Sequence, residues 1–151
     1  MVLRDVTEDD LPILFEHQRE PEANRMASFP ARDRDAFMTH WHTKVLGEPN
    51  NRKKAIVVDD EVVGNIVSWE QDGKRLVGYW IGKAYWGRGI ATAALEEFVA
   101  DHEKARPIYA HVSVQNVGSV RVLEKCGFRQ VGDAVTASDG VEEILMQLGI
   151  P

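Results

Sequence analysis

The apolar positions of this chain change period several times, and each change marks the boundary of a predicted element. A short strand is predicted at Val2–Val6. Thr7 then caps a helix whose first turn is acidic and which ends before Pro21. The prolines and the weak periodicity between Glu20 and Asp33 predict a loop. A second helix, from Asp33 to about Leu46, carries apolar residues at four-residue spacing.

The middle of the chain alternates apolar and polar residues, a pattern typical of half-buried strands. Turn residues separate the runs, one group around Asp60 and another at Gln71-Asp72-Gly73. Three consecutive hairpin strands are therefore predicted, at Lys54–Asp59, Glu61–Glu70 and Arg75–Gly82.

Helical and strand patterns alternate in the last third of the chain. Asn116 is a good N-cap for one helix, and Gly127 can end that helix in the left-handed conformation. The order of elements is β-α-α-β-β-β-α-β-α-β-β, which predicts a mixed α/β sheet rather than a doubly wound one. The elements predicted here are a helix at Ala91–Lys104, a strand at Pro107–Val114, the Asn116 helix, and strands at Phe128–Ala137 and Val141–Leu148 joined by the turn Ser138-Asp139-Gly140.

Length and composition narrow the class of protein. A chain of 151 residues with 44% hydrophobic content predicts a single domain, residues 1–151, with a substantial core. No apolar run approaches the roughly 20 residues of a membrane span, and charges occupy the place of a signal peptide's apolar region. A cytoplasmic protein without a membrane partner is therefore expected. The net charge of −6 argues against a nucleic-acid footprint and slightly favours a cationic acceptor.

A metal site is not expected from the ligand-type residues. Cys126 is the single cysteine, so it has no partner for a disulfide or a zinc site and is expected to pack in its helix. His40 and His42 are two residues apart on a predicted helix and cannot face one another. His17 is expected to face solvent.

The segment Tyr79–Thr92 carries the most informative motif. An aromatic strand runs into a turn that contains Gly87 and Gly89, and the turn opens directly into a helix. The first N–H groups of a helix have no intrahelical partners, and glycines allow a phosphate to approach them. The segment therefore predicts an anion site. The chain has no Gly-x-x-x-x-Gly-Lys-Ser/Thr string, and Thr92 stands where a dinucleotide fingerprint needs its third small residue.

This segment resembles the acetyl-CoA pyrophosphate loop of the GNAT N-acetyltransferases, whose pattern is Gln/Arg-x-x-Gly-x-Gly/Ala. Gly89 and Ala91 match the pattern, whereas Trp86 departs from the usual Gln or Arg. The string Tyr-Trp-Gly-x-Gly-x-Ala-Thr is similar to the branch of ribosomal-protein alanine N-acetyltransferases. The stretch from Asn116 to Phe128 is similar to the second signature of the family, Asn-x-x-Ser/Ala followed by a helix that ends in Gly-Phe.

The resemblance implies a GNAT-like acyl-CoA N-acyltransferase fold over essentially the whole chain. It implies that a backbone N–H near Ile81 binds the thioester carbonyl, that Asn116 bonds the pantetheine arm, and that Ser119 lies near the coenzyme. The acetyl-CoA-binding residues implied in this way are Ile81, Trp86, Gly87, Arg88, Gly89, Ile90, Ala91, Thr92, Asn116 and Ser119.

Acyl transfer to an amine also needs a base for the amine proton and a group that stabilises the leaving thiolate. Many family members carry a Tyr seven residues after the Asn, but Leu123 occupies that position here. Two candidate bases remain: Glu70, at the end of a strand where related enzymes place an acidic group, and His111, on a predicted strand. Hydroxyl groups that could replace the missing Tyr belong to Tyr79, Tyr109 and Ser113.

The sequence thus predicts an N-acetyltransferase that moves the acetyl group of acetyl-CoA directly to a primary amine in a ternary complex. The acceptor is a protein N-terminus or a small amine metabolite. The alternative is a non-catalytic module that senses CoA or acyl-CoA, a hypothesis that Leu123 supports. The resemblance places acceptor-selecting residues in the loop that contains Arg25, Met26 and Phe29. An exposed edge among the final strands would support a homodimer.

Overall fold

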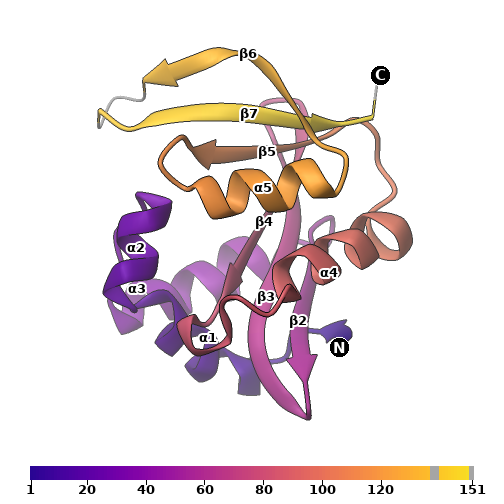
Figure 1. Cartoon of the computed structure of the whole chain (residues 1–151). Helices are drawn as coiled ribbons and strands as arrows, with labels where there is room; N and C mark the ends of the chain where they lie inside the picture. Colours follow the sequence, from indigo (N-terminus) through magenta and orange to yellow (C-terminus); the bar gives the residue numbers. More distant parts are fainter. Residues whose placement is uncertain (137–139, 150–151) are drawn as a thin grey trace.

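A computed structural model describes residues 1–136 and 140–149 of the chain (Figure 1). The strands in these residues are β1 (Val2–Asp5), β2 (Arg52–Val58), β3 (Glu61–Gln71), β4 (Lys74–Ile81), β5 (Ile108–Ser113), β6 (Arg129–Thr136) and β7 (Glu142–Leu148). They form one sheet in the order β1-β2-β3-β4-β5-β7-β6. Only the β4–β5 pair is parallel in the described sheet. The predicted mixed α/β fold is confirmed.

The helical elements occupy most of the predicted positions. They are η1 (Glu8–Asp10), α1 (Leu11–Gln18), α2 (Pro21–Ala27), α3 (Arg34–His40), η2 (Trp41–Val45), η3 (Lys83–Tyr85), α4 (Ile90–Glu97), η4 (Phe98–His102) and α5 (Val117–Lys125). The turns η2 and η4 are π-helical, so the second and third predicted helices each continue an α-helix with a wider turn. Within the described residues, each helix falls short of the length and apolar character that a membrane crossing requires.

Helix α2 corrects the loop predicted between Glu20 and Asp33. The Glu20 carboxylate accepts a hydrogen bond of 2.7 Å from the Ala23 N–H and caps the helix. Pro21 occupies the first helical position, where its missing N–H costs nothing. Only Ala23 of this helix is buried, so the segment lacks the apolar stripe on which a periodicity argument depends.

The predicted hairpin turns are confirmed where the structure describes them. Asp59 and Asp60 both have positive φ, as do Asp72 and Gly73, which is the conformation that two-residue hairpin loops require. The last predicted turn falls on Ser138 and Asp139, which lie outside the described residues.

Two buried clusters lie on opposite faces of the sheet. One contains Leu11, Leu14 and Phe15 of α1 with Phe37 and the η2 residues Trp41 and Val45, and it packs on Ala55 of β2. The other joins α4 and α5 to the sheet and includes the fully buried side chains Phe98, Ile66 and Leu95. Helices α1–α3 therefore cover one face, and α4 with α5 covers the other (Figure 1).

A buried ion pair fixes the far end of α4 and η4 to the β3–β4 hairpin. The Glu103 carboxylate, just after η4, accepts hydrogen bonds of 2.6 Å from the Ser68 hydroxyl and 2.6 Å from the Arg75 Nε. Burial alone would raise the pKa of Glu103, but these hydrogen bonds outweigh it and hold the pKa below its usual value. These contacts anchor the C-terminal end of the α4–η4 segment to β3 and β4.

Candidate active site

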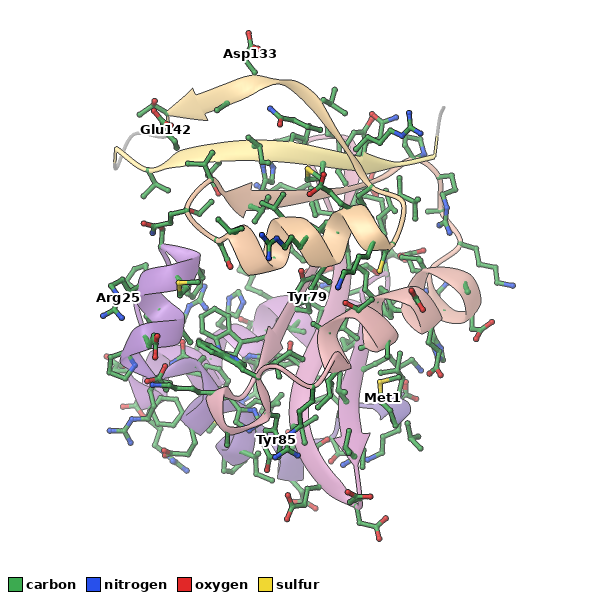
Figure 2. The ribbon with its side chains drawn as sticks, in the orientation of Figure 1. Met1, Arg25, Tyr79, Tyr85, Asp133 and Glu142 are labelled. Carbon is green, nitrogen blue, oxygen red and sulfur yellow. The ribbon has the colours of Figure 1, made fainter. Side chains whose placement is uncertain are left out.

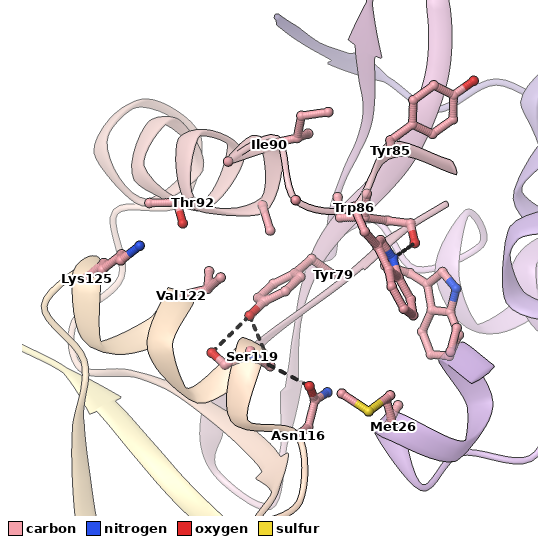
Figure 3. Close-up of a pocket in the computed structure, with 18 residues that line it drawn as sticks. Met26, Tyr79, Tyr85, Trp86, Ile90, Thr92, Asn116, Ser119, Val122 and Lys125 are labelled. Atoms are coloured by element: carbon pink, nitrogen blue, oxygen red, sulfur yellow. Dashed lines mark hydrogen bonds between the residues drawn. The ribbon is translucent and has the colours of Figure 1, made fainter. Parts of the chain in front are cut away.

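A cavity of about 520 Å³ lies between β4, the N-termini of α4 and α5, and helix α2 (Figure 3). This volume is within the range of pockets that bind small molecules and cofactors. The residues that line it are Ala23, Met26, Ala27, Tyr79, Trp80, Ile81, Tyr85, Trp86, Gly87, Gly89, Ile90, Ala91, Thr92, Asn116, Gly118, Ser119, Val122 and Lys125. Of the predicted acetyl-CoA-binding residues, all except Arg88 are in this set.

The glycine turn has the geometry of an anion site. Gly87 and Gly89 have φ values of +78° and +74°, which L-amino acids with side chains rarely adopt, and the space beside both glycines is open. The first hydrogen bond within α4 runs from the Ala93 N–H to the Gly89 carbonyl. The N–H groups of Ile90, Ala91 and Thr92 therefore have no acceptor within the helix and point toward its open end.

Trp86 holds the turn against the end of β4. Its indole Nε1 donates a hydrogen bond of 3.0 Å to the Ile81 carbonyl. Arg88 instead lies over the ring of Tyr85, with 5.7 Å between its guanidinium carbon and the ring centroid. The Arg88 side chain thus packs on the outside of the turn rather than in the cavity.

The backbone of Ile81 faces the opening between β4 and β5. The Gly82 N–H donates to the Val63 carbonyl, and hydrogen-bonded pairs alternate along an antiparallel ladder. The N–H of Ile81 therefore points to the opposite edge of β4. At that edge the β4–β5 ladder is confined to the pair Leu76 and Tyr109, so the two strands separate before Ile81 is reached.

The N-terminus of α5 forms the opposite wall of the cavity. The Asn116 side chain accepts a hydrogen bond of 3.3 Å from the Ser119 N–H, which confirms the predicted cap. The Ser119 hydroxyl lies 2.6 Å from the hydroxyl of Tyr79, which reaches across from β4 (Figure 3). Burial raises the pKa of Tyr79 to about 12, so its hydroxyl stays protonated at neutral pH.

The fold assigns places in the cavity that the sequence left open or missed. Tyr79 was one of several hydroxyl candidates, and only the fold shows that it meets Ser119. Lys125, at the end of α5, lines the cavity near Thr92 (Figure 3), and the signal for it was its place nine residues after Asn116 on one helix. Helix α2 supplies Ala23, Met26 and Ala27; Met26 was expected among acceptor-selecting residues, but in a loop rather than a helix.

The structure places neither predicted base in the cavity. Glu70 is exposed at the hairpin end of β3, where it is the register partner of Arg75 on β4. Gly64 of the same strand is the register partner of Ile81. Six residues of strand, about 20 Å, separate these two levels. The expectation that Glu70 lies beside the reacting groups is therefore corrected. His111 is exposed on β5 and points to the same sheet face as Ser113, whose hydroxyl lies 3.2 Å from that of Ser28 after α2.

His17 is not the solvent-facing residue that the sequence predicted. Its Nδ1 is buried without a hydrogen-bond partner among the described residues. A side chain at Gly82 would come within 2.7 Å of its ring, and its backbone carbonyl accepts a hydrogen bond of 3.1 Å from the Trp80 indole. Burial lowers the pKa of His17, so the ring is neutral at physiological pH.

A family model described as the acetyltransferase (GNAT) domain matches residues 1–129 of the chain. The chain belongs to the GNAT acetyltransferases. It is also 24% identical over 145 residues to an uncharacterized N-acetyltransferase p20 of Bacillus licheniformis, covering 87% of this chain and 80% of that protein. The probable N-acetyltransferase YjcK of Bacillus subtilis is 40% identical over 83 residues, which is 50% of this chain and 46% of the relative.

Solved structures of GNAT enzymes have the same fold. The spermidine N-acetyltransferase of Vibrio cholerae, solved with CoA and spermine, superposes with a TM-score of 0.81 at 16% identity, covering 97% of this chain and 94% of that one. The aminoglycoside acetyltransferase AAC(6')-Ib, solved with ribostamycin and CoA, has a TM-score of 0.76 at 23% identity, covering 98% and 92%. The prediction of an acetyl-CoA-dependent N-acetyltransferase is confirmed for this GNAT enzyme at the level of the family, with acetyl-CoA as cosubstrate.

Proposed function

We propose that this GNAT enzyme transfers the acetyl group of acetyl-CoA directly to the primary amine of a small molecule in a ternary complex. The observation that carries the proposal is the single cavity that joins the open N-terminus of α4 to the unpaired edge of β4 at Ile81. Such a cavity holds a phosphate at one end and a thioester carbonyl at the other.

The residues at the first end suit the phosphates of the coenzyme. The N–H groups that follow Gly89 supply the positive end of the α4 dipole, and the open space beside Gly87 and Gly89 lets a phosphate approach the backbone. Lys125 adds a positive charge on the opposite wall. The amide of Asn116 lies farther along the cavity wall and would hydrogen-bond the pantetheine arm.

The residues at the second end suit acyl transfer. The Ile81 N–H would donate to the thioester carbonyl oxygen, where negative charge develops as the amine nitrogen bonds to the carbonyl carbon. The carbon–sulfur bond then breaks with its electron pair on sulfur. The Tyr79 hydroxyl, supported by Ser119, would donate a hydrogen bond to that sulfur and take the role of the Tyr that Leu123 replaces.

The acceptor amine must lose a proton before or during attack. His111 remains the candidate base, because it lies on the sheet face that α2 covers, although it does not line the cavity. A base at that position would take the proton through a water molecule.

The relatives of this fold favour a small acceptor over a protein N-terminus, because two of the structures were solved with spermine and ribostamycin. The ribosomal-protein branch rests on the string from Tyr85 to Thr92 alone. The sensor alternative rested on Leu123, and the Tyr79–Ser119 pair weakens it by supplying hydroxyl groups at the cavity. A homodimer and a cytoplasmic location stay predictions.

The test is thiol release from acetyl-CoA by the purified chain in the presence of single primary amines, with mass spectrometry of the products. Turnover that depends on one amine class, together with an N-acetylated product, supports an N-acetyltransferase. Tight acetyl-CoA binding without amine-dependent turnover across polyamines, aminoglycosides, amino acids and N-terminal peptides would instead favour the sensor.

A further inference from the structure

Arg32, in the segment between α2 and α3, is a partly buried arginine without a carboxylate partner among the described residues. Burial lowers the pKa of its guanidinium, and no nearby acid offsets this effect. Removing a charge from water without pairing it is unfavourable. An arginine kept in this state is therefore suited to binding an anion that is not part of the folded chain.

The backbone of Arg32 is held in place by a buried side chain of α1. The Gln18 amide donates a hydrogen bond of 3.1 Å to the Arg32 carbonyl and accepts one of 3.4 Å from the Arg32 N–H. Gln18 is only 6% exposed, so its buried side chain holds the Arg32 backbone through both hydrogen bonds. The guanidinium carbon of Arg32 then lies 5.1 Å from the centroid of the Phe29 ring.

Two aromatic rings connect Arg32 to the reacting end of the cavity. Phe29 is 38% exposed and meets the Trp80 ring edge to face, with 5.9 Å between the ring centroids. Trp80 lines the cavity and directly precedes Ile81. The phosphate end of the cavity lies at Thr92 and Lys125, and Met26 of α2 lies at the other end (Figure 3). Phe29 and Arg32 are outside the cavity lining, and the Phe29–Trp80 contact joins them to its α2 end.

Several acidic residues on this side have partners of their own and none of them is Arg32. Glu20 and Glu22 of the α2 region lie 3.5 Å and 2.6 Å from the Lys83 Nζ. Glu16 pairs with Arg19 at 3.3 Å. Asp33 caps α3 through the Ala36 N–H. The guanidinium of Arg32 is thus left without a carboxylate among the described residues, although acidic groups are near it in the sequence.

We propose that Arg32 is the anion-binding residue of the acceptor site and that the natural acceptor is a primary amine that also carries a carboxylate, such as an amino acid. The carboxylate pairs with the guanidinium, the apolar part of the acceptor rests on Phe29 and Trp80, and the amine reaches the thioester at Ile81. This inference rests on the proposed acetyltransferase function. The need for a carboxylate on the acceptor would distinguish this enzyme from enzymes whose acceptors are purely cationic.

The test compares acceptors that differ only in the carboxylate. Lysine, tyrosine and phenylalanine are each assayed against their carboxamides and against the decarboxylated amines cadaverine, tyramine and phenethylamine. The carboxamides have a lower amine pKa and therefore more free amine, so a preference for the acids cannot come from the amine. We expect kcat/KM to be at least about tenfold higher for the acid of at least one set, as one charge-assisted contact provides.

Variants assign that preference to Arg32. Arg32→Gln should lower the acid-to-amide ratio of kcat/KM about tenfold, mainly through KM, and Arg32→Lys should retain part of it. Arg34→Gln is the matched control, because it removes the same charge two residues away. Arg34 is exposed and lies over the Phe15 ring. The acetyl-CoA affinity and melting temperature of each variant report on folding.

A binding measurement keeps the outcome clear if turnover is absent. Each acid and its amide are titrated calorimetrically into the protein saturated with CoA. If the acid binds more tightly than its amide and Arg32→Gln abolishes this preference, the anion site is supported. If no amine is acetylated in that case, only the proposed function fails. Equal or weaker binding and turnover of the acids, or a preference that Arg32→Gln leaves intact, overturns the inference while acetylation of other amines still supports the enzyme.

Discussion

The hydroxyl of Tyr79 in β4 and the hydroxyl of Ser119 in α5 lie 2.6 Å apart, and both residues line the cavity. Figure 2 shows Tyr79 between α4 and α5, in the interior of the molecule. The two residues are 40 positions apart in sequence, so only the fold creates the pair. One turn farther along α5, Leu123 is 1% exposed and packs in the core, so it has no access to the cavity.

Removal of the Tyr79 hydroxyl should slow the chemical step. Tyr79→Phe keeps the ring but removes the group that would hydrogen-bond the leaving sulfur, a contact to a charged group of about 1.5–3 kcal/mol. We expect kcat to fall by about 10- to 100-fold, while the dissociation constant of acetyl-CoA changes much less. Steady-state kinetics and calorimetry measure the two effects. A wild-type kcat in this variant would exclude Tyr79 from the reaction.

The state of Tyr79 also makes a prediction about pH. Because its pKa is raised to about 12, the hydroxyl remains a donor throughout the working range. The rate profile of the wild type should therefore show no alkaline decline from this group below about pH 11. If Tyr79→Phe shifts an alkaline limb that the wild type shows near pH 9, the hydroxyl titrates much earlier than the structure implies.

Lys125 should contribute to coenzyme binding through charge alone. A unit charge about 4 Å from a phosphate in water contributes about 1 kcal/mol, so Lys125→Ala should weaken acetyl-CoA binding about fivefold. The loss should shrink at high salt because the residue is exposed. Lys74→Ala is the control, since Lys74 lies over the Tyr109 ring and outside the cavity lining. Equal effects of both substitutions would argue against a phosphate near Lys125.

The buried Glu103–Arg75 pair should be costly to break on one side only. Arg75→Met leaves the Glu103 carboxylate buried and unpaired, and we expect it to lower the free energy of unfolding by about 3–5 kcal/mol. The double variant Arg75→Met/Glu103→Gln should recover part of that loss. Lys54→Met, which breaks the exposed pair with Asp5, should cost less than about 1 kcal/mol. Urea denaturation measures all three, and equal losses for Arg75→Met and Lys54→Met would contradict this account.

The burial of His17 should make the fold less stable in mild acid. Burial lowers the pKa of His17 below its ordinary value of 6.5, so the unfolded chain takes up this proton first as the pH falls. Stability should therefore be lost as the pH drops below about 6.5. His17→Gln should remove part of that slope, and the rest is expected from His40, whose pKa burial also lowers. Urea midpoints at pH 7.0 and 5.5 measure this loss of stability in the wild type and in His17→Gln. The same loss in both proteins would contradict the burial argument.

The sequence was sufficient for elements whose signals are local. The caps at Thr7 and Asn116 and the hairpin turn at Asp72 follow from side-chain and backbone preferences within a few residues. The glycine turn before α4 is of the same kind. Its two glycines were recognisable because they stand between an aromatic strand and a helix, and both adopt the positive φ that glycine favours.

The parts that sequence analysis missed depend on tertiary contacts. Helix α2 lacks an apolar stripe, and α2 docks through Gln115, which donates a hydrogen bond of 2.8 Å to the Arg25 carbonyl from 90 positions away. Glu70 was placed correctly on a strand, but the register that sets its level against Ile81 follows from the whole hairpin. The burial of His17 also depends on a tertiary contact, because the packing of α1 on Gly82 covers its ring.

The central claim is that the cavity binds acetyl-CoA through the glycine turn before α4, and calorimetric titration of acetyl-CoA tests it most directly with a matched pair of glycine variants. Gly89 and Gly73 have φ values of +74° and +77° with open space beside them, so substitution by Ala strains both backbones by about 1–2 kcal/mol. Gly73 lies in the β3–β4 hairpin turn, away from the cavity. The account predicts that wild type and Gly73→Ala bind acetyl-CoA equally and that Gly89→Ala binds at least about tenfold more weakly. Equal affinity in Gly89→Ala and Gly73→Ala, or no binding by the wild type, would contradict it.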